Sequence, residues 1–309
     1  MNDFATVGVV GGGLIGMSWT ALFLARGRSV IVLDPASGTE EQLHSFLRNA
    51  WPHLTALGLT ESDAASKPTV TTDFSALSNV DFVQENGPER LETKKDIIAR
   101  LEAVIGQDVV IASSTSSLKA SDMQIGAQHP ERILVAHPMN PPHLVPMVEL
   151  VGGRITSEET LVTAEQFYAA MQRVTIRVKR EVPGHLANRL TSALYREAVH
   201  LVAEGIADVA DIDKAVAFGP GMRWALMGPH LIYHLGGGEQ GYRGYLEHLG
   251  PTQEARWQSL GHPTLTEPLK AALVAGVEAE IAALDADTLV ERRDAALVEL
   301  MKLKRAKGL

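Results

Sequence analysis

The most informative segment of the chain reads Thr6-Val7-Gly8-Val9-Val10-Gly11-Gly12-Gly13-Leu14-Ile15-Gly16. Its first five residues are rich in valine, as in a buried strand, and a helical pattern runs from Leu14 to Arg26. Gly11, Gly13 and Gly16 fit a G-x-G-x-x-G pattern at the junction. The first glycine permits a tight turn, the second lets a diphosphate approach the backbone, and the third lets the helix pack closely on the strand. The segment therefore predicts a βα unit that binds a dinucleotide.

The choice of dinucleotide follows from Asp34, which ends the next expected strand, Ser29–Leu33. It lies about 20 residues beyond the glycines, where such folds place a carboxylate that binds the adenosine ribose. A carboxylate there would repel a 2′-phosphate, and Pro35-Ala36-Ser37 supply no arginine to attract one. We therefore predict NAD as the cofactor. Its phosphates are expected at the helix N-terminus, on the backbone of Leu14 and Ile15.

The rest of the first half repeats the alternation of strands and helices. Further strands are expected at 81–83, 109–112 and 133–136, and helices at 40–57, 89–104 and 158–171. This alternation predicts a Rossmann-type α/β domain with a doubly wound, mostly parallel sheet.

Beyond Pro183 strand patterns almost disappear. Helices are expected at 186–202, 208–218, 269–284 and 287–307, and a Gly/Pro-rich stretch at 219–250 is expected to interrupt them. We therefore predict an NAD-binding domain over 1–184 and an all-α domain over 185–309.

Composition excludes several classes of protein. The 309 residues carry a net charge of −9, which disfavours binding to nucleic acid. The chain has no cysteine, so disulfides, thiolate catalysis and thiolate metal sites are excluded. No apolar run approaches the length of a membrane span, and Met1-Asn2-Asp3-Phe4 lacks the basic start of a signal peptide. We expect a cytoplasmic protein that acts on a small molecule without a membrane, a nucleic acid or a metal.

Oxidation of an alcohol by NAD requires a base, and His137 is the best candidate because it ends an expected strand. Ligands of open α/β sheets bind at the carboxyl ends of such strands. Glu149, twelve residues on, could orient the imidazole and stabilise its cation. Ser116 follows another strand end, and Asn188 begins the helical half. Taken singly, each also has an ordinary structural interpretation as a turn, a cap or a solvated side chain.

Taken together, these residues resemble the 3-hydroxyacyl-CoA dehydrogenase family. The family's segments T-S-S-L, H-x-x-N-P, V-E and P-G-x-x-x-N-R-L occur in order at 115–118, 137–141, 148–149 and 183–190. The resemblance implies His137 as general base, Glu149 as its partner, Ser116 as a hydrogen-bond donor to the reacting oxygen, and Asn188 at the substrate. It also implies cofactor contacts by Glu89 and Lys94, whose alternative interpretation is a solvated pair on a helix. A homodimer formed through the helical domain is a further implication.

The predicted substrate depends on two segments in which this sequence differs from the acyl-CoA members of that family. The chain lacks the G-x-G-F-Y-type segment with which acyl-CoA members end, and Gly221-Met222-Arg223-Trp224 resembles the branch that acts on free acids. That branch contains L-carnitine 3-dehydrogenase, L-gulonate 3-dehydrogenase and the lens protein λ-crystallin. Arg223 or Arg189 could pair with a substrate carboxylate, and Trp224 could bind a trimethylammonium group.

These residues predict an NAD-dependent dehydrogenase of a small 3-hydroxy acid, with L-carnitine and L-gulonate almost equally favoured. Asn140 is a further candidate contact to the substrate. The alternatives are a short-chain L-3-hydroxyacyl-CoA dehydrogenase and a non-catalytic, crystallin-like protein that binds NAD. A metal hydrolase that uses His129, His137 and His143 is the remaining alternative, and their spacing does not favour it.

Overall fold

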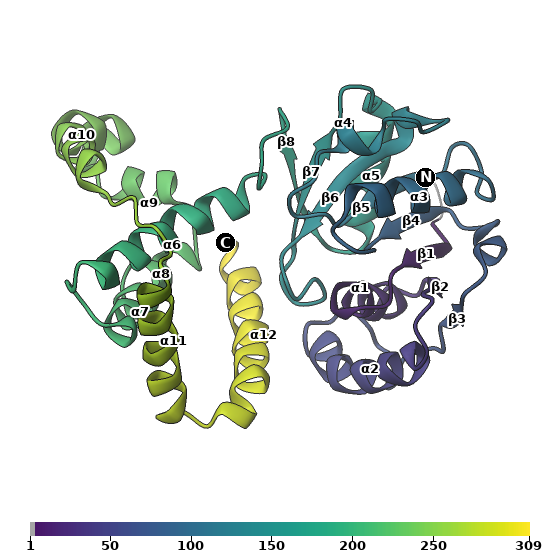
Figure 1. The fold of residues 1–309 in the computed structure, drawn as a ribbon, viewed down its shortest axis with the longest axis horizontal. Helices are drawn as coiled ribbons and strands as arrows, with labels where there is room; N and C mark the ends of the chain where they lie inside the picture. The colour runs from purple at the N-terminus through teal and green to yellow at the C-terminus, as the bar shows by residue number, and fades with distance from the viewer. Residues whose placement is uncertain (1–3) are drawn as a thin grey trace. The chain divides into compact units, whose positions relative to one another are not determined.

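A central sheet organises the first part of the computed structural model, which describes residues 4–309 (Figure 1). Within those residues the sheet has eight strands in the order β3-β2-β1-β4-β5-β6-β7-β8. Their bounds are β1 Thr6–Val10, β2 Ser29–Leu33, β3 Thr69–Thr71, β4 Phe82–Glu85, β5 Val110–Ser113, β6 Ile133–Pro138, β7 Met147–Gly152 and β8 Val174–Val178. All neighbours pair in parallel except β6 and β7. The predicted Rossmann-type, mostly parallel sheet is thus confirmed.

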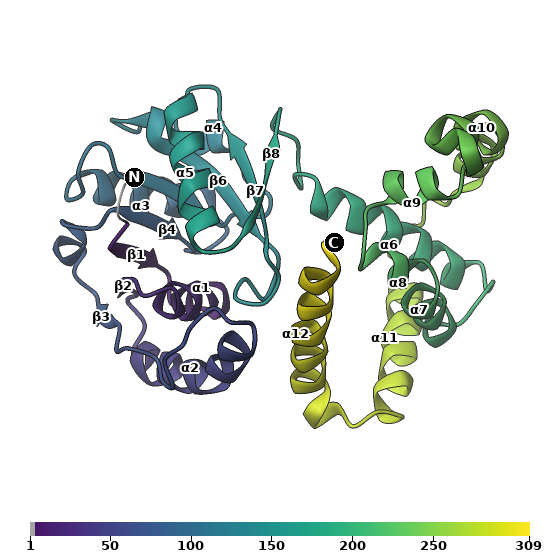
Figure 2. The same ribbon diagram turned by 180° about the vertical axis from the view of Figure 1, so that it is seen from behind.

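Helices cover both faces of this sheet (Figure 2). They are α1 Leu14–Ala25, α2 Thr39–Ala56, α3 Leu91–Glu102, α4 Ala120–Met123 and α5 Glu158–Ala170, with short 3₁₀ turns at Phe74–Leu77 and Pro130–Arg132. Neighbouring side chains of β4 point to opposite faces. Phe82 stacks on Phe167 of α5 with 3.8 Å between ring centroids, whereas Val83 joins the apolar cluster that includes Ile98 of α3. Both faces of the sheet are therefore buried, as βαβ crossovers require.

The strand register brings the candidate residues to one edge of the sheet. Val10 of β1 pairs with Leu33 of β2 and with Glu85 of β4, so the segments that follow these three strands lie side by side. In the antiparallel pair of β6 and β7, His137 lies directly opposite Glu149. Residues 139–146 connect the two strands, so that Glu149, twelve residues after His137 in the chain, lies beside it in the sheet.

Three strands were not predicted. β3 is only three residues long and partly exposed, so its pattern is too short to detect. β7 carries Glu149 within its apolar run, and β8 is largely exposed at the edge of the sheet. A pattern based on buried apolar residues does not detect such strands.

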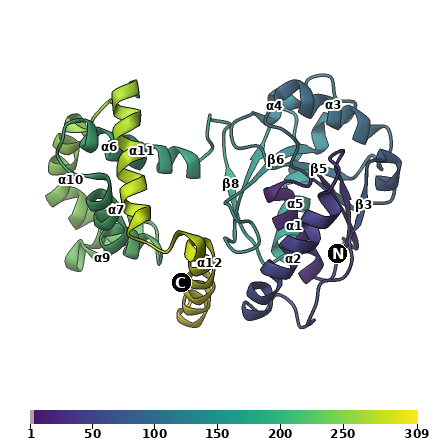
Figure 3. The same ribbon diagram turned by 60° about the horizontal axis from the view of Figure 1, so that its bottom comes forward.

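The second part of the chain is helical (Figure 3). Its elements are α6 Ala187–Ala203, α7 Val209–Phe218, α8 Pro220–Trp224, α9 Pro229–Leu235, α10 Gly241–Ser259, α11 Glu267–Ala282 and α12 Leu289–Lys307, with 3₁₀ turns at Gly238–Gln240 and Ala286–Thr288. The expectation that 219–250 interrupts the helices was wrong for much of that stretch, because α8, α9 and the start of α10 lie in it. Pro220 and Pro229 stand at helix starts, where proline is favoured.

Contacts between residues divide the chain into two compact units, one up to Arg189 and the other Leu190–Leu309. The division falls inside α6, a few residues beyond the predicted boundary at 184. Within residues 4–309, the helices all lack the combination of length and apolar character that crossing a membrane requires.

Candidate active site

The glycine-rich turn between β1 and α1 has the shape that a dinucleotide needs. Gly11 has a φ of +90°, and a Cβ there would lie 2.7 Å from the carbonyl oxygen of Asn86. A Cβ on Gly16 would overlap the carbonyl oxygen of Gly11. At Gly13, by contrast, a Cβ would meet only open space, and no side chain caps the start of α1. The amides of this helix end are thus accessible to a diphosphate, which fits the predicted NAD.

Asp34 lies beside this turn, immediately after β2. Its Oδ2 accepts a hydrogen bond from the amide of Gly12 at 2.6 Å, and its Oδ1 accepts one from the amide of Ala36 at 2.8 Å. Each carboxylate oxygen can accept a further hydrogen bond, so both remain competent to bind a ribose hydroxyl. The residues present therefore fit NAD.

A histidine and a glutamate, the predicted base and its predicted partner, form a buried pair in the structure. His137 Nδ1 lies 2.7 Å from Glu149 Oε2, and both side chains are buried. Glu149 Oε1 accepts hydrogen bonds from the amides of Leu186 at 2.7 Å and Ala187 at 2.9 Å. Burial raises the pKa of Glu149, but the hydrogen bonds from His137 and the two amides more than offset this, so the pKa is lowered. The carboxylate is charged at neutral pH, which assigns the proton of neutral His137 to Nδ1 and leaves Nε2 as the basic nitrogen.

A cleft of about 500 Å³ opens beside this pair, wholly within the first unit. It brings together seven residues predicted from the sequence, namely Ile15, Glu89, Lys94, Ser116, His137, Asn140 and Asn188. Asn188 also donates from Nδ2 to the carbonyl oxygen of Ser116 at 3.4 Å. Glu149 does not line the cleft but lies behind His137, as a partner of the base should. The cleft can hold an alcohol between a base, a hydroxyl donor and an amide.

Glu89 and Lys94 differ from the solvated pair that is their alternative interpretation. Lys94 is 1% exposed and donates to Glu85 Oε1 at 3.0 Å, to Glu85 Oε2 at 2.8 Å and to the carbonyl oxygen of Gly87 at 3.1 Å. Glu89 Oε1 accepts from the amides of Ser116 and Ser117, each at 3.0 Å, and thereby orders the serine turn. Their predicted contacts with the cofactor remain predictions.

The electrostatic state of Glu89 follows from the same contacts. Burial raises its pKa, but the hydroxyls of Thr115 and Ser117 and the charge of Lys94 lower it further than burial raises it. Glu89 is therefore a carboxylate at neutral pH, and it holds the turn that carries Ser116.

Several residues of the site were not predicted. Asn86, Ser114 and Met139 line the cleft, and Glu85 is the buried partner of Lys94. The signal in the sequence that could have pointed to Glu85 and Asn86 is the pair of polar residues, Gln84 and Glu85, that ends a central strand.

The remaining candidates for the substrate lie outside this cleft. Arg223 and Trp224 belong to α8 of the second unit, where Trp224 is 41% exposed. Of the three histidines considered for a metal, His137 is bound to Glu149 and His143 Nδ1 lies 2.7 Å from Ser18 Oγ. Among residues 4–309, no group of three or more metal-ligating side chains is placed to hold an ion.

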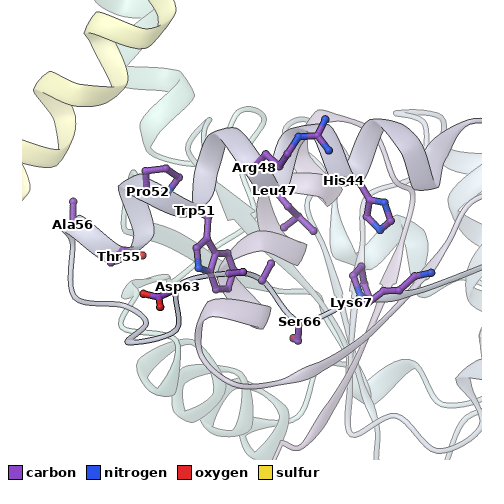
Figure 4. A pocket seen from close by; sticks show the side chains of 13 residues that line it. His44, Leu47, Arg48, Trp51, Pro52, Thr55, Ala56, Asp63, Ser66 and Lys67 are labelled. Atoms are coloured by element: carbon purple, nitrogen blue, oxygen red, sulfur yellow. The ribbon is translucent and has the colours of Figure 1, made fainter.

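A larger cavity of about 950 Å³ lies elsewhere in the first unit, between α2 and the segment 63–68 (Figure 4). Trp51 forms part of its wall, and His44, Arg48 and Lys67 lie around it. It shares no lining residue with the cleft at His137, and none of the predicted site residues lines it. The predicted site residues thus lie at the smaller cleft and not at this cavity.

Comparisons with known proteins agree with this geometry. Residues 6–182 match the family described as 3-hydroxyacyl-CoA dehydrogenase, NAD binding domain, and residues 184–272 match its C-terminal domain. The chain is 43% identical to an L-carnitine dehydrogenase of Bacillus cereus, over 98% of this chain and 93% of the relative. It is 45% identical to an L-carnitine dehydrogenase of Streptomyces coelicolor, over 96% of this chain and 93% of the relative.

A solved structure resembles the whole chain as well. It is 5-formyl-3-hydroxy-2-methylpyridine 4-carboxylic acid 5-dehydrogenase, an NAD+-dependent dismutase, with a TM-score of 0.84 and 28% identity over 98% of this chain and 99% of that one. The matches extend across both units. The chain therefore belongs to the 3-hydroxyacyl-CoA dehydrogenase family, and it is an NAD-dependent oxidoreductase that acts on the CH–OH group of a 3-hydroxy acid.

Proposed function

We propose that this chain oxidises the 3-hydroxyl group of L-carnitine to the 3-oxo acid. The observation that carries the proposal is the buried His137–Glu149 pair beside the cleft. The choice of L-carnitine within the free-acid branch is supported by relatives at 43% and 45% identity that are named L-carnitine dehydrogenase. NAD held by the glycine turn and Asp34 would supply the acceptor for the hydride of the substrate carbon.

In the proposed mechanism, the hydroxyl proton passes to Nε2 of His137 as the C–H bond breaks. The products are the ketone, NADH and a proton that His137 returns to water. Glu149 stabilises the imidazolium through Nδ1, and base catalysis of this kind contributes about 10²–10⁴ in rate. Ser116 donates a hydrogen bond to the reacting oxygen, and Asn188 positions the substrate.

Two features of L-carnitine select it in this proposal. Its carboxylate pairs with a cation, for which Arg223 is the candidate, and its trimethylammonium group binds the face of Trp224. Asn140 contributes a polar contact from the cleft. L-Gulonate has the carboxylate and lacks the quaternary cation, so it should bind more weakly to the same residues.

The second candidate is a short-chain L-3-hydroxyacyl-CoA, which the name of the matching family favours. The solved structure with a TM-score of 0.84 is named for a pyridine carboxylic acid, which supports a free acid instead. A non-catalytic protein is the third candidate, and the complete set of Ser116, His137, Glu149 and Asn188 argues against it.

One assay separates these candidates. The formation of NADH is followed at mildly alkaline pH with L-carnitine, L-gulonate, L-3-hydroxybutyrate and L-3-hydroxybutyryl-CoA. The proposal expects the highest kcat/KM for L-carnitine. Turnover of the thioester alone would assign the chain to the acyl-CoA branch, and turnover of none would favour the non-catalytic candidate.

A homodimer is also proposed, formed through the second unit. In that unit large apolar side chains are exposed on several helices, among them Phe218 at 79% and Trp257 at 63%. A second copy of the chain would cover such a surface. Light scattering after gel filtration should give twice the mass of one chain, and the mass of a single chain would contradict the proposal. The expected cytoplasmic location is likewise a proposal, which cell fractionation tests.

A further inference from the structure

A second buried histidine packs against the catalytic pair, and no sequence pattern identified it. His185 is 2% exposed, and the centroid of its ring lies 5.2 Å from that of the His137 ring, with 46° between the ring planes. It does not line the cleft, so it cannot touch the substrate there. Any effect of His185 on the reaction must therefore act through its neighbours.

The backbone at His185 is strained in a way that serves Glu149. Gly184 has a φ of +76° and His185 a φ of +49°, a region that residues other than glycine rarely occupy. The two amides that follow, those of Leu186 and Ala187, both donate to Glu149 Oε1. Successive amides presented in this way form a concave site for an anion. The strained turn thus aims two donors at the carboxylate that orients the base.

The side chain of His185 connects this turn to the serine turn. Its Nε2 lies 3.3 Å from the carbonyl oxygen of Thr115, the residue before Ser116. Because a carbonyl oxygen only accepts, this contact places the proton of His185 on Nε2. Asn188 makes the second connection, from Nδ2 to the carbonyl oxygen of Ser116. The imidazole of His185 therefore contacts both the ring of His137 and the turn that carries Ser116. His185 itself belongs to the turn that leads to Asn188.

We propose that His185 is a positioning residue for the oxidation, which holds His137, Ser116 and Asn188 in one arrangement around the substrate. The inference rests on the proposed function of the site, because it assigns His137 to chemistry. A histidine suits this place because its ring fills the space behind His137 while Nε2 donates to Thr115. A phenyl ring would fill the space without the donor, and a shorter amide would supply the donor without the ring.

The charge state of His185 is consistent with this role. Burial lowers its pKa, and the neighbouring His137 lowers it further, whereas the Thr115 carbonyl, Glu149 and Glu89 act in the opposite direction. Its Nδ1 is buried and has no hydrogen-bond partner within residues 4–309. The lowered pKa keeps His185 neutral at neutral pH.

The test compares two substitutions at this position. His185→Phe keeps a ring and removes the donor, so kcat should fall by up to about 100-fold, as for displaced catalytic groups. His185→Asn keeps a donor and tolerates the positive φ, so it should recover part of that loss. In both variants the Kd for NADH, measured by fluorescence, should stay within about twofold, since His185 contacts neither the glycine turn nor Asp34.

Trp51→Phe is the matched control. Trp51 is another buried ring in the first unit, and its Nε1 donates to the carbonyl oxygen of Ser62 at 2.9 Å. This substitution also removes a ring donor from a backbone carbonyl but leaves the cleft unchanged, so it should lower Tm without lowering kcat. If His185→Phe behaved in the same way, with a lower Tm and an unchanged kcat, the positioning role would be overturned.

A spectroscopic measurement keeps this inference separate from the proposed function. In enzyme labelled with ¹⁵N-histidine, the resonance absent from His185→Phe should report a neutral ring protonated on Nε2 at neutral pH. That result needs no substrate. An imidazolium, or a proton on Nδ1, would overturn the role of His185 even if L-carnitine were turned over. If none of the acids in the panel were oxidised, the proposed function would be overturned. The tautomer of His185 would still be decided by the ¹⁵N measurement alone.

Discussion

The two units of the chain differ in how much of their apolar surface they bury. Up to Arg189, helices on both faces of a sheet bury a large core, and the cofactor turn, the base and its partner are all fixed by hydrogen bonds. In Leu190–Leu309 few side chains are buried, and α11 has none that are. The predicted base, its partner and the cofactor turn thus lie in the unit with the large buried core, whereas two candidates for substrate selection, Arg223 and Trp224, lie in the unit with few buried side chains. Substitutions in the first unit should therefore change catalysis and the cofactor, and those in the second should change the substrate.

The largest expected effect is that of His137→Gln in the first unit. Loss of the base should lower kcat by about 10²–10⁴, while the Kd for NADH changes little because the glycine turn is intact. Stopped-flow measurement of hydride transfer and NADH fluorescence test the two parts. If NADH binding were lost together with turnover, His137 would serve the cofactor site and its assignment to chemistry would be wrong.

Asp34→Ala should change the choice of cofactor and leave the choice of acid unchanged. The lost hydrogen bonds to a charged group are worth about 1.5–3 kcal/mol, so kcat/KM for NAD relative to NADP should fall roughly 10- to 100-fold. Asp34→Asn, which removes only the charge, is the comparison variant. An unchanged ratio in both variants would show that Asp34 does not select the cofactor.

Trp224→Leu tests the second unit. If the indole binds the trimethylammonium group, a contribution of about 2 kcal/mol predicts a rise of roughly 30-fold in KM for L-carnitine. KM for L-3-hydroxybutyrate, which lacks the cation, should change little, and so should KM for NAD. Equal losses for both acids would mean that Trp224 serves packing and that selection of the cation lies elsewhere.

The smallest effect is expected from Glu89→Gln, through stability. The pKa of Glu89 is lowered in the folded chain, so the carboxylate stabilises the fold above the ordinary pKa of glutamate, about 4.3, and this contribution is lost as pH falls through the folded value. Because the side chain is 40% exposed, the loss at neutral pH should stay below about 1 kcal/mol. Thermal unfolding at pH 7 and at successively lower pH should show a Tm difference between the two proteins that shrinks as the pH falls. If the Tm difference did not change on acidification, the charge of the Glu89 carboxylate would not be the source of the stabilisation.

The sequence predicted the parts of the site that depend on local pattern. Gly11, Gly13 and Asp34 lie where the strand register places them, and His137 meets Glu149 because a short antiparallel return joins them. The burial of Lys94 against Glu85 could not be read in the same way, since a lysine on a helix has the same pattern whether it faces water or a strand end. The position of His185 depends on two positive φ angles and on contacts across the fold, which no spacing encodes.

The amide contacts of Glu149 also concern how the two halves of the chain are joined. The carboxylate accepts from residues 186 and 187, at the very start of α6, and this helix continues past Arg189 into the second unit. Glu149 therefore has two partners of different kinds: it pairs with the imidazole of His137, and it holds the first residues of α6 in place.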